Sequence, residues 1–549
     1  MEASAHAGAR LHDVDWSGRD EPRHGAAGAT INRLPVLLLP GDVFASRRIR
    51  PVLQQLESPV AQGISVNDTL RPVSRYWDRI ERPEQLLAAL PEAMRVLTSV
   101  SETGAVTLAL PQDTQVETVD YPAEFLQPRV WRIPRPEPEA ALLDAVAQLA
   151  AAAHQPMIVA GGGVRYSEAE EELDAFARAF SVPVAETQAG KGSLAWDHPW
   201  NLGPIGATGG LAANRYAAAA DLVIEVGARL ADFTTASWTA WQNPDLQFVG
   251  INVAEADAAR AGAIALVADA RQTLRALRRR LAEVGAGGDR SRMDEVARLH
   301  VEWRAEVDRQ RCRQSAEPGR LTQPQVIAAV NDAAGTKGTV VCAAGSMPGD
   351  LHKLWRAQSP DDYHVEYGYS CMGYEIAGAL GVKIADPSRD VFVLVGDGSY
   401  LMMNSEITTS IQEGAPLTIV VVDSHGFASI GALARSMGGR NNFNELRARD
   451  PQTGRLDGPY LPVDFAGHAA SMGATVRQAA TEPELAAALA DARQADRTNV
   501  IVVEVDTSEQ VPGHESWWDV PVAEESESPT VKAAREKYEE ARVAERWHG

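Results

Sequence analysis

The stretch FVLVGDGSYLMMNSEITTSIQEGAPLTIVVVDSHGF, residues 392–427, contains two apolar runs that each end in polar residues. The first run enters the turn Gly396 to Ser399 (GDGS), and the second ends at Ser424, 27 residues after Asp397. A helix and a strand together occupy about this length, so the stretch predicts a strand-helix-strand unit of a parallel sheet. Two unrelated turns are the alternative.

The ends of these two strands predict a binding site. Ligands of open parallel sheets bind beyond the carboxyl ends of the strands. In the GDGS turn, the backbone N–H groups and the start of the following helix can face phosphate oxygens. Asp397 offers the carboxylate oxygen that Mg²⁺ takes together with phosphate, and the second strand end, at Ser424, would supply further oxygens. The sequence therefore predicts a phosphate and Mg²⁺ site at this edge.

The same alternation of apolar strands and helices extends through most of the chain. Examples are GTVVCAAG and NVIVVEVD in the last third, QPMIVAGGG and ADLVIEVG in the middle, and NRLPVLLLPGD and AVTLALPQD near the start. A chain of 549 residues is too long for one core, because cores stop growing near about 250 to 300 residues. We therefore predict an α/β protein with three consecutive doubly wound parallel-sheet domains. The expected boundaries are a polar, poorly ordered leader at 1–27, domains at 28–130, 140–285 and 322–508, and a C-terminal tail at 509–549.

Composition excludes several classes of protein. No apolar run approaches the ~18 residues of a membrane helix. The net charge of -22 argues against nucleic acid as a partner, because phosphate-backbone binding relies on clustered Lys and Arg. Cys312, Cys342 and Cys371 are widely spaced and contain no CxxC pair, which favours a reducing, cytoplasmic location over a disulfide framework or zinc site.

Other motifs are weaker. Gly161 to Gly163 follows an apolar strand without GxGxxG spacing, so either a nucleotide site or a tight turn fits it. ETQAGKGS fails as a P-loop because Ala185 stands where the first glycine is required. Ser370, in GYSCMG, has the wrong spacing for a nucleophile elbow.

The GDGS turn, followed after 27 residues by a polar side chain before a glycine, resembles the diphosphate and Mg²⁺ motif of thiamine diphosphate (ThDP) enzymes. Three α/β domains, which are pyrimidine-binding, central and diphosphate-binding, are also the plan of that superfamily. Several segments of the amino-acid sequence are similar to one branch of this superfamily, the ring-opening trihydroxycyclohexane-1,2-dione hydrolases of inositol breakdown. The segments that carry this resemblance include NRLPVLLLPGDVFASR, RPVSRYWDRIERPEQL, AGSMPGDLHKLW, EYGYSCMGYEIAGALG and SWWDVPVAE.

The resemblance implies roles for individual residues. Asp397 and the side chain at position 424 would bind the metal together with the backbone carbonyl of Gly426. Met372 would support the bent cofactor, although by itself it is typical of a core methionine. The diphosphate would be held by Gly345, Ser346, Gly396, Gly398 and Ser399.

The resemblance also implies the reaction and the assembly. The cofactor would attack one carbonyl of a cyclic 1,2-dione, the adjacent C–C bond would break, and water would release a carboxylate. His425 and His352 flank the predicted site and are candidate catalytic proton carriers, although loop histidines are more often structural hydrogen-bonding groups. A homodimer or homotetramer is expected, since ThDP sites form between two subunits.

Two departures from the family pattern leave alternatives open. Ser424 stands where the family has Asn, and its shorter hydroxyl predicts weaker Mg²⁺ binding. The family's activating Glu would lie upstream of NRLPVLLLPGD, and neither Glu2 nor Glu21 has the matching surroundings. We expect a truncated first domain or a misplaced gene start. A genuine short form, whose site is empty, repurposed or completed by another polypeptide, is the alternative. The function alternatives are a carboligase or decarboxylase on another keto substrate, and a catalytically impaired homologue or subunit.

Overall fold

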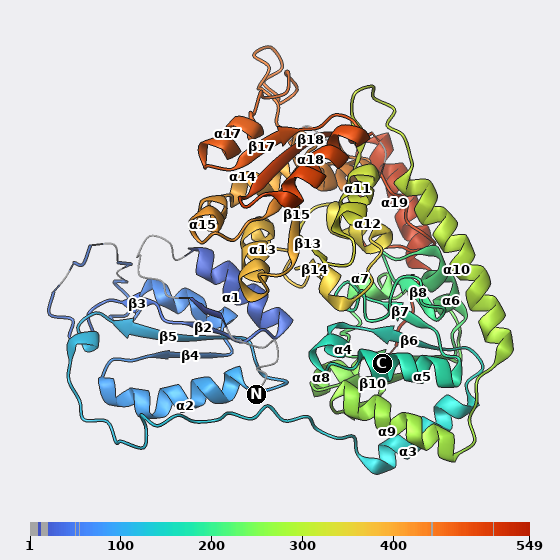
Figure 1. Ribbon diagram of the computed structural model, residues 1–549, viewed down its shortest axis with the longest axis horizontal. Coiled ribbons are helices and arrows are strands. Elements are labelled where there is room, and N and C mark those ends of the chain that lie inside the picture. Colours follow the sequence, from blue (N-terminus) through green and yellow to red (C-terminus); the bar gives the residue numbers. More distant parts are fainter. Residues whose placement is uncertain are drawn as a thin grey trace. The chain divides into compact units, whose positions relative to one another are not determined.

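The computed structural model describes residues 9–11, 20–49, 51–53, 55–56, 58–440, 443–508 and 510–548. The chain forms two compact units, residues 1–135 with 368–371 and residues 136–367 with 372–549 (Figure 1). Unit 1 holds one sheet and unit 2 holds two. All ladders between the named strands are parallel, which confirms the predicted fold class. Within the described residues, no helix combines the length and apolar character that crossing a membrane requires.

Unit 1 is built around one buried strand, β5. Its elements are β1 (Ala9–Leu11), α1 (Asp20–Asn32), β2 (Val36–Leu38), β3 (Gly41–Asp42), η1 (Val66–Val73), β4 (Tyr76–Arg79), η2 (Pro83–Gln85), α2 (Leu86–Leu97), β5 (Ala105–Pro111) and η3 (Thr114–Val116). The sheet has the order β1-β2-β5-β3, with β4 on the other edge of β5. The run AVTLALP of β5 is apolar because the strand is covered along nearly its whole length, and α2 packs Ala89 and Ala93 against Val106 and Leu108.

The predicted leader, 1–27, differs from the structure at its end. Most of its residues lie outside the described part of the chain. Helix α1 nevertheless begins at Asp20, and its Ala26 and Ala29 are buried against Leu38. The charged residues around this segment led to the prediction of a polar leader. Its alanines instead pack into a small core that forms only when the unit folds.

The first sheet of unit 2 has the order β11-β10-β9-β6-β7-β8. Its elements are α3 (Ala140–Ala152), β6 (Pro156–Ala160), α4 (Gly162–Tyr166), α5 (Glu170–Phe180), β7 (Val184–Glu186), β8 (Asn201–Pro204), α6 (Leu211–Ala219), β9 (Leu222–Val226), α7 (Asp232–Thr235), β10 (Gln247–Asn252), α8 (Glu255–Ala258), η4 (Arg260–Gly262), β11 (Ile264–Val267), α9 (Ala270–Glu283) and α10 (Arg290–Arg311). The strand order reverses between β6 and β9, where doubly wound sheets commonly bind ligands.

At this reversal the backbone after β6 packs directly against the backbone after β9. Gly161 donates its N–H to the carbonyl of Val226 at 2.9 Å, and Gly163 donates to the carbonyl of Gly227 at 2.9 Å. A Cβ at Gly163 would lie 2.5 Å from the Cα of Gly227. The N–H groups of Gly161 and Gly163 are therefore already bonded to backbone carbonyls. These contacts favour the tight turn over a nucleotide site for the glycine triplet.

The second sheet of unit 2 has the order β12-β18-β16-β15-β13-β14, with β17 also on β18. Its elements are β12 (Leu321–Thr322), α11 (Gln323–Ala334), β13 (Gly338–Cys342), α12 (Met347–Leu354), η5 (Pro360–Asp362), β14 (Tyr363–Val365), α13 (Tyr374–Ala385), β15 (Asp390–Gly396), α14 (Asp397–Met402), α15 (Glu406–Gln412), β16 (Thr418–Asp423), α16 (Ala428–Ser436), α17 (Phe465–Ser471), β17 (Thr475–Gln478), α18 (Glu482–Gln494), β18 (Asn499–Asp506) and α19 (Pro529–Arg542). After β13 the chain adds β14 on one side and then β15 on the other, so the strand order reverses between β13 and β15.

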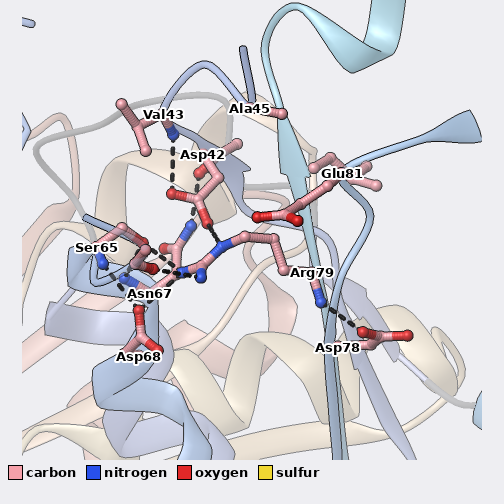
Figure 2. A network of polar contacts seen from close by, with 12 residues as sticks. Asp42, Val43, Ala45, Ser65, Asn67, Asp68, Asp78, Arg79 and Glu81 are labelled. Carbon is pink, nitrogen blue, oxygen red and sulfur yellow. Dashed lines mark hydrogen bonds and ion pairs between the residues drawn. The ribbon is translucent and has the colours of Figure 1, made fainter. Parts of the chain in front are cut away.

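A buried ionic network links the carboxyl ends of β3 and β4 in unit 1 (Figure 2). Arg79, at the end of β4, pairs through Nε with Asp42 Oδ2 at 2.7 Å and through Nη2 with Asp68 Oδ2 at 2.7 Å. It also donates to Ser65 Oγ at 2.9 Å and to the carbonyl of Gly63 at 2.7 Å. The Asp42 side chain is fully buried and that of Arg79 is 12% exposed, so one guanidinium joins β4 to β3 and to the segment 63–68.

Arg79→Met should lower the free energy of unfolding of unit 1 by about 3 to 5 kcal/mol, because the Asp42 carboxylate stays buried without its cation. Hydrogen exchange of unit 1 peptides in increasing urea measures the change. Arg71→Met is the matched control, since Arg71 also pairs with Asp68, at 2.9 Å, but its side chain is 54% exposed. The control should change stability by less than about 1 kcal/mol. Equal small losses in both variants would contradict the buried-charge argument.

Candidate functional site

Three adjacent strands carry polar turns at one rim of the second sheet of unit 2. β15 pairs with β13 on one side and with β16 on the other. Because all three are parallel, their carboxyl ends meet at the same rim. β13 leads to Gly345 and Ser346, β15 to the GDGS turn, and β16 to Ser424 and Gly426. The strand order reverses between β13 and β15, which is where an open sheet of this kind binds ligands.

The three predicted metal ligands lie together at this rim. The hydroxyl of Ser424 lies 3.2 Å from Asp397 Oδ1 and 3.1 Å from the carbonyl oxygen of Gly426. In an octahedral Mg²⁺ site with ligands at ~2.0 to 2.1 Å, neighbouring ligand oxygens are about 2.9 Å apart. The spacing and the all-oxygen chemistry therefore fit Mg²⁺. Within the described residues, no group of three or more His, Cys, Asp or Glu side chains is placed to hold a metal, so the rim offers one carboxylate with a hydroxyl and a carbonyl oxygen.

Asp397 is held in an unusual electrostatic setting. Its side chain is buried, and burial together with the nearby Asp423 carboxylate raises its pKa to about 7. The N–H of Gly426 donates to Asp397 Oδ2 at 2.6 Å, which favours the ionised form. A cation beside Oδ1 would act in the same direction as this N–H. The site thus has the negative charge that a divalent ion would neutralise.

The residues predicted to bind the diphosphate differ in which of their polar groups are available to a ligand. A Cβ at Gly345 or Gly396 would meet no atom beyond its chain neighbours within 4 Å, so the space before both backbones is open. Ser346 donates its hydroxyl to Gln323 Oε1 at 3.2 Å. Ser399 is buried, and its hydroxyl is already bonded inside the protein. Ser399 can therefore offer a ligand its backbone N–H, which the first turn of α14 leaves without a helical acceptor.

Met372 lies next to a residue that contacts the GDGS turn. The N–H of Gly373, the following residue, donates to Ser399 Oγ at 2.8 Å. Gly373 has φ +94°, a left-handed conformation that favours glycine. This bond places the backbone of Met372 beside the predicted diphosphate turn, and the supporting role of its side chain stays a prediction.

His425 follows the predicted metal-binding position and has a carboxylate partner. Its Nε2 lies 2.6 Å from Glu504 Oε1, and its ring stacks on Tyr460 with centroids 4.3 Å apart. Arg320 also pairs with Glu504. The backbone N–H of His425 donates to Asp423 Oδ1 at 3.0 Å. His425 is thus at the rim, where Glu504 fixes its ring, and its catalytic role stays a prediction.

The ring of His352 contacts the end of β7 and the connection between β8 and α6. Its Nδ1 lies 3.0 Å from Thr208 Oγ1, and its Nε2 lies 3.2 Å from the carbonyl oxygen of Glu186. The side chain is buried, and burial together with the Lys191 charge lowers its pKa well below 6.5. Both ring nitrogens are occupied in a neutral imidazole. These contacts are typical of a structural histidine. They do not support the predicted role of His352 as a proton carrier.

Sequence reasoning passed over two acidic residues of this site. Asp423 stands in the quoted DSHG turn and Glu375 in SCMGYE, yet neither received a role. Their positions beside polar turns were the available signal. Asp423 raises the pKa of Asp397, and Glu375 is the acceptor for the Ser399 hydroxyl.

Comparison with known proteins agrees with this geometry. Residues 143–277 match the family model described as "Thiamine pyrophosphate enzyme, central domain", and residues 343–505 match "Thiamine pyrophosphate enzyme, C-terminal TPP binding domain". A protein of Bacillus cereus (strain AH820) named 3D-(3,5/4)-trihydroxycyclohexane-1,2-dione hydrolase is 44% identical over 534 residues, which is 93% of this chain and 82% of the relative. A protein of the same name from Bacillus thuringiensis (strain Al Hakam) is 44% identical over 535 residues, with the same coverage.

These matches confirm the resemblance drawn from the GDGS turn and the segments around it. The two family models cover the first sheet of unit 2 and most of the second, including the rim that carries Asp397 and Ser424. The protein therefore belongs to the ThDP-dependent enzymes and, among them, to the family of the 3D-(3,5/4)-trihydroxycyclohexane-1,2-dione hydrolases.

Proposed function

We propose that this protein is a ThDP- and Mg²⁺-dependent hydrolase that opens the ring of a trihydroxycyclohexane-1,2-dione during myo-inositol breakdown. The observation that carries the proposal is the cluster of oxygens from Asp397, Ser424 and Gly426 beside the open backbone of Gly345 and Gly396. The names of the relatives support the choice of substrate.

The residues at the rim divide the work of binding. Asp397, Ser424 and the Gly426 carbonyl would hold Mg²⁺. Backbone N–H groups at Gly345, Ser346, Gly396, Gly398 and Ser399 would orient the diphosphate, as N–H groups at strand ends and helix starts do for phosphate in general. When bound, ThDP supplies the carbon nucleophile and the electron sink for C–C cleavage. Met372 would support the cofactor from the segment that joins the GDGS turn.

His425 is the proposed proton carrier of the site. Its Nε2 lies 2.6 Å from Glu504 Oε1, so this carboxylate can hold a ring proton on Nε2. The stacked Tyr460 fixes the plane of the ring, and the N–H bond to Asp423 fixes the backbone. Release of a carboxylic acid after ring opening requires proton transfer, and His425 is the imidazole adjacent to the metal-binding position.

A homodimer or homotetramer in the cytoplasm completes the proposal. Large apolar side chains are exposed on segments that flank the rim, among them Leu401, Met402, Ile430 and Phe443. Exposed apolar groups that cluster near a site favour a protein interface. Their positions on and beside α14 and α16 support subunit contact close to the cofactor.

An impaired homologue is the second candidate, and Ser424 is the observation that favours it. A serine hydroxyl is shorter than the family's asparagine side chain, and here it is shared between Asp397 and Gly426. A water would then complete the metal's coordination, at a cost in affinity. This candidate and the hydrolase differ in whether the purified chain binds the cofactor.

Purified protein supplied with ThDP and Mg²⁺ should consume a trihydroxycyclohexane-1,2-dione and form one carboxylic acid per ring opened. Chromatography of the product and the release of protons measure this reaction. Asp397→Asn should reduce the rate by at least about a hundredfold, because the metal loses its only carboxylate ligand. If the protein bound the cofactor but converted only acyclic keto acids, the proposed substrate would be wrong. No cofactor binding at all would favour the impaired homologue.

Ser424→Asn should tighten Mg²⁺ binding by about tenfold, because the amide oxygen reaches further than the hydroxyl and replaces a bridging water. Calorimetric titration of Mg²⁺ at saturating ThDP measures the change. Ser436→Asn, an exposed serine at the end of α16, is the matched control and should leave the titration unchanged. Equal Mg²⁺ affinity in the wild type and Ser424→Asn would show that position 424 does not bind the metal.

A further inference from the structure

A buried carboxylate, Glu375, is bonded to the GDGS turn. Glu375, in the first turn of α13, is fully buried. Its Oε1 accepts the Ser399 hydroxyl at 2.8 Å and the N–H of Ala344 at 3.4 Å. Its Oε2 accepts the N–H of Gly373 at 2.9 Å. One side chain thus receives hydrogen bonds from the start of its own helix and from two distant segments.

Each of these segments carries a residue predicted to contact the cofactor. Ala344 precedes Gly345 in the turn after β13. Gly373 follows Met372 at the start of α13. Ser399 belongs to the GDGS turn after β15. The carboxylate of Glu375 therefore joins three backbone segments, each within one residue of a predicted cofactor contact.

We propose that Glu375 is the positioning residue of the cofactor site, which fixes the spacing of these three segments before ThDP binds. The inference rests on the proposed function. It also assigns the hydrogen-bond donors of the site. Because the Ser399 hydroxyl and the Gly373 N–H are bonded to Glu375, the diphosphate must take its bonds from the backbone of Gly345, Ser346 and the GDGS turn.

The chemistry of the position requires an acid. Burial raises the pKa of the Glu375 carboxyl, whereas its hydrogen bonds and its place at a helix N-terminus favour the ionised form. A buried acid is costly to keep, and an apolar residue of similar size would avoid that cost. Glutamine has one acceptor oxygen in place of two, so it would place an NH₂ group against one of the three donors. Only a carboxylate accepts from all of them.

Glu375→Gln should therefore weaken ThDP binding while the fold persists. We expect the Kd for ThDP at saturating Mg²⁺ to rise about tenfold, which corresponds to the loss of one hydrogen bond to a charged acceptor. Calorimetry or quenching of tryptophan fluorescence measures the Kd, and thermal unfolding without ligand measures stability.

The matched control is Glu225→Gln, in β9 of the first sheet of unit 2. Glu225 is also a buried acid whose pKa burial raises, and it accepts the N–H of Ala228. It contacts none of the predicted cofactor residues in these bonds. A purely structural role for Glu375 predicts that both variants change the unfolding temperature and that neither changes the Kd.

The outcomes separate the inference from the proposed function. If the wild type binds no ThDP, the proposed function fails and takes this inference with it. If the wild type binds and Glu375→Gln binds equally well, only the positioning role is overturned. A tenfold rise in Kd for Glu375→Gln, with none for Glu225→Gln, supports the inference.

Hydrogen exchange on the wild-type protein keeps the test open should Glu375→Gln fail to fold. The amides of Ala344 and Gly373 should be protected from exchange before any ThDP is added, since Glu375 already holds them. Protection that develops only after ThDP binds would overturn the proposal.

Discussion

The candidate site depends on the bonds that Asp397 accepts. The Gly426 N–H and the Ser424 hydroxyl both donate to this carboxylate, which joins the end of β15 to the end of β16. This contact exists because the strands are parallel neighbours and their polar turns fall at the same rim. The cost is a buried acid whose pKa rises to about 7. A divalent cation at the rim would offset that cost, so the local electrostatics and the proposed chemistry point the same way.

The sequence could predict this pair because strand-helix-strand geometry links spacing in the chain to position in space. Asp397 and Ser424 are 27 residues apart, which is the length of one such unit, and the structure brings them to 3.2 Å. The parallel sheets were predictable for a similar reason, since apolar runs such as FVLV are typical of strands buried on both faces. Local patterns with a fixed geometric consequence were therefore sufficient.

Other features depend on contacts that no local pattern encodes. His352 follows the Gly345-Ser346 turn in sequence, yet Thr208 and Glu186 from a distant part of the chain occupy its ring nitrogens. Glu375 has an ordinary helical setting in sequence, and its importance comes from the three segments that converge on it. Helix α1 was assigned to a leader because its alanines acquire a core only when unit 1 folds.

Crystals grown with ThDP and Mn²⁺ in place of Mg²⁺ test the central claim most directly, because anomalous scattering locates the metal. We expect one strong peak bonded to Asp397 and to the carbonyl oxygen of Gly426, with Ser424 bound directly or through a water, and the diphosphate beside Gly345 and Gly396. A peak elsewhere, or an Asp397 side chain that remains bonded only to the protein in the presence of bound ThDP, would contradict it.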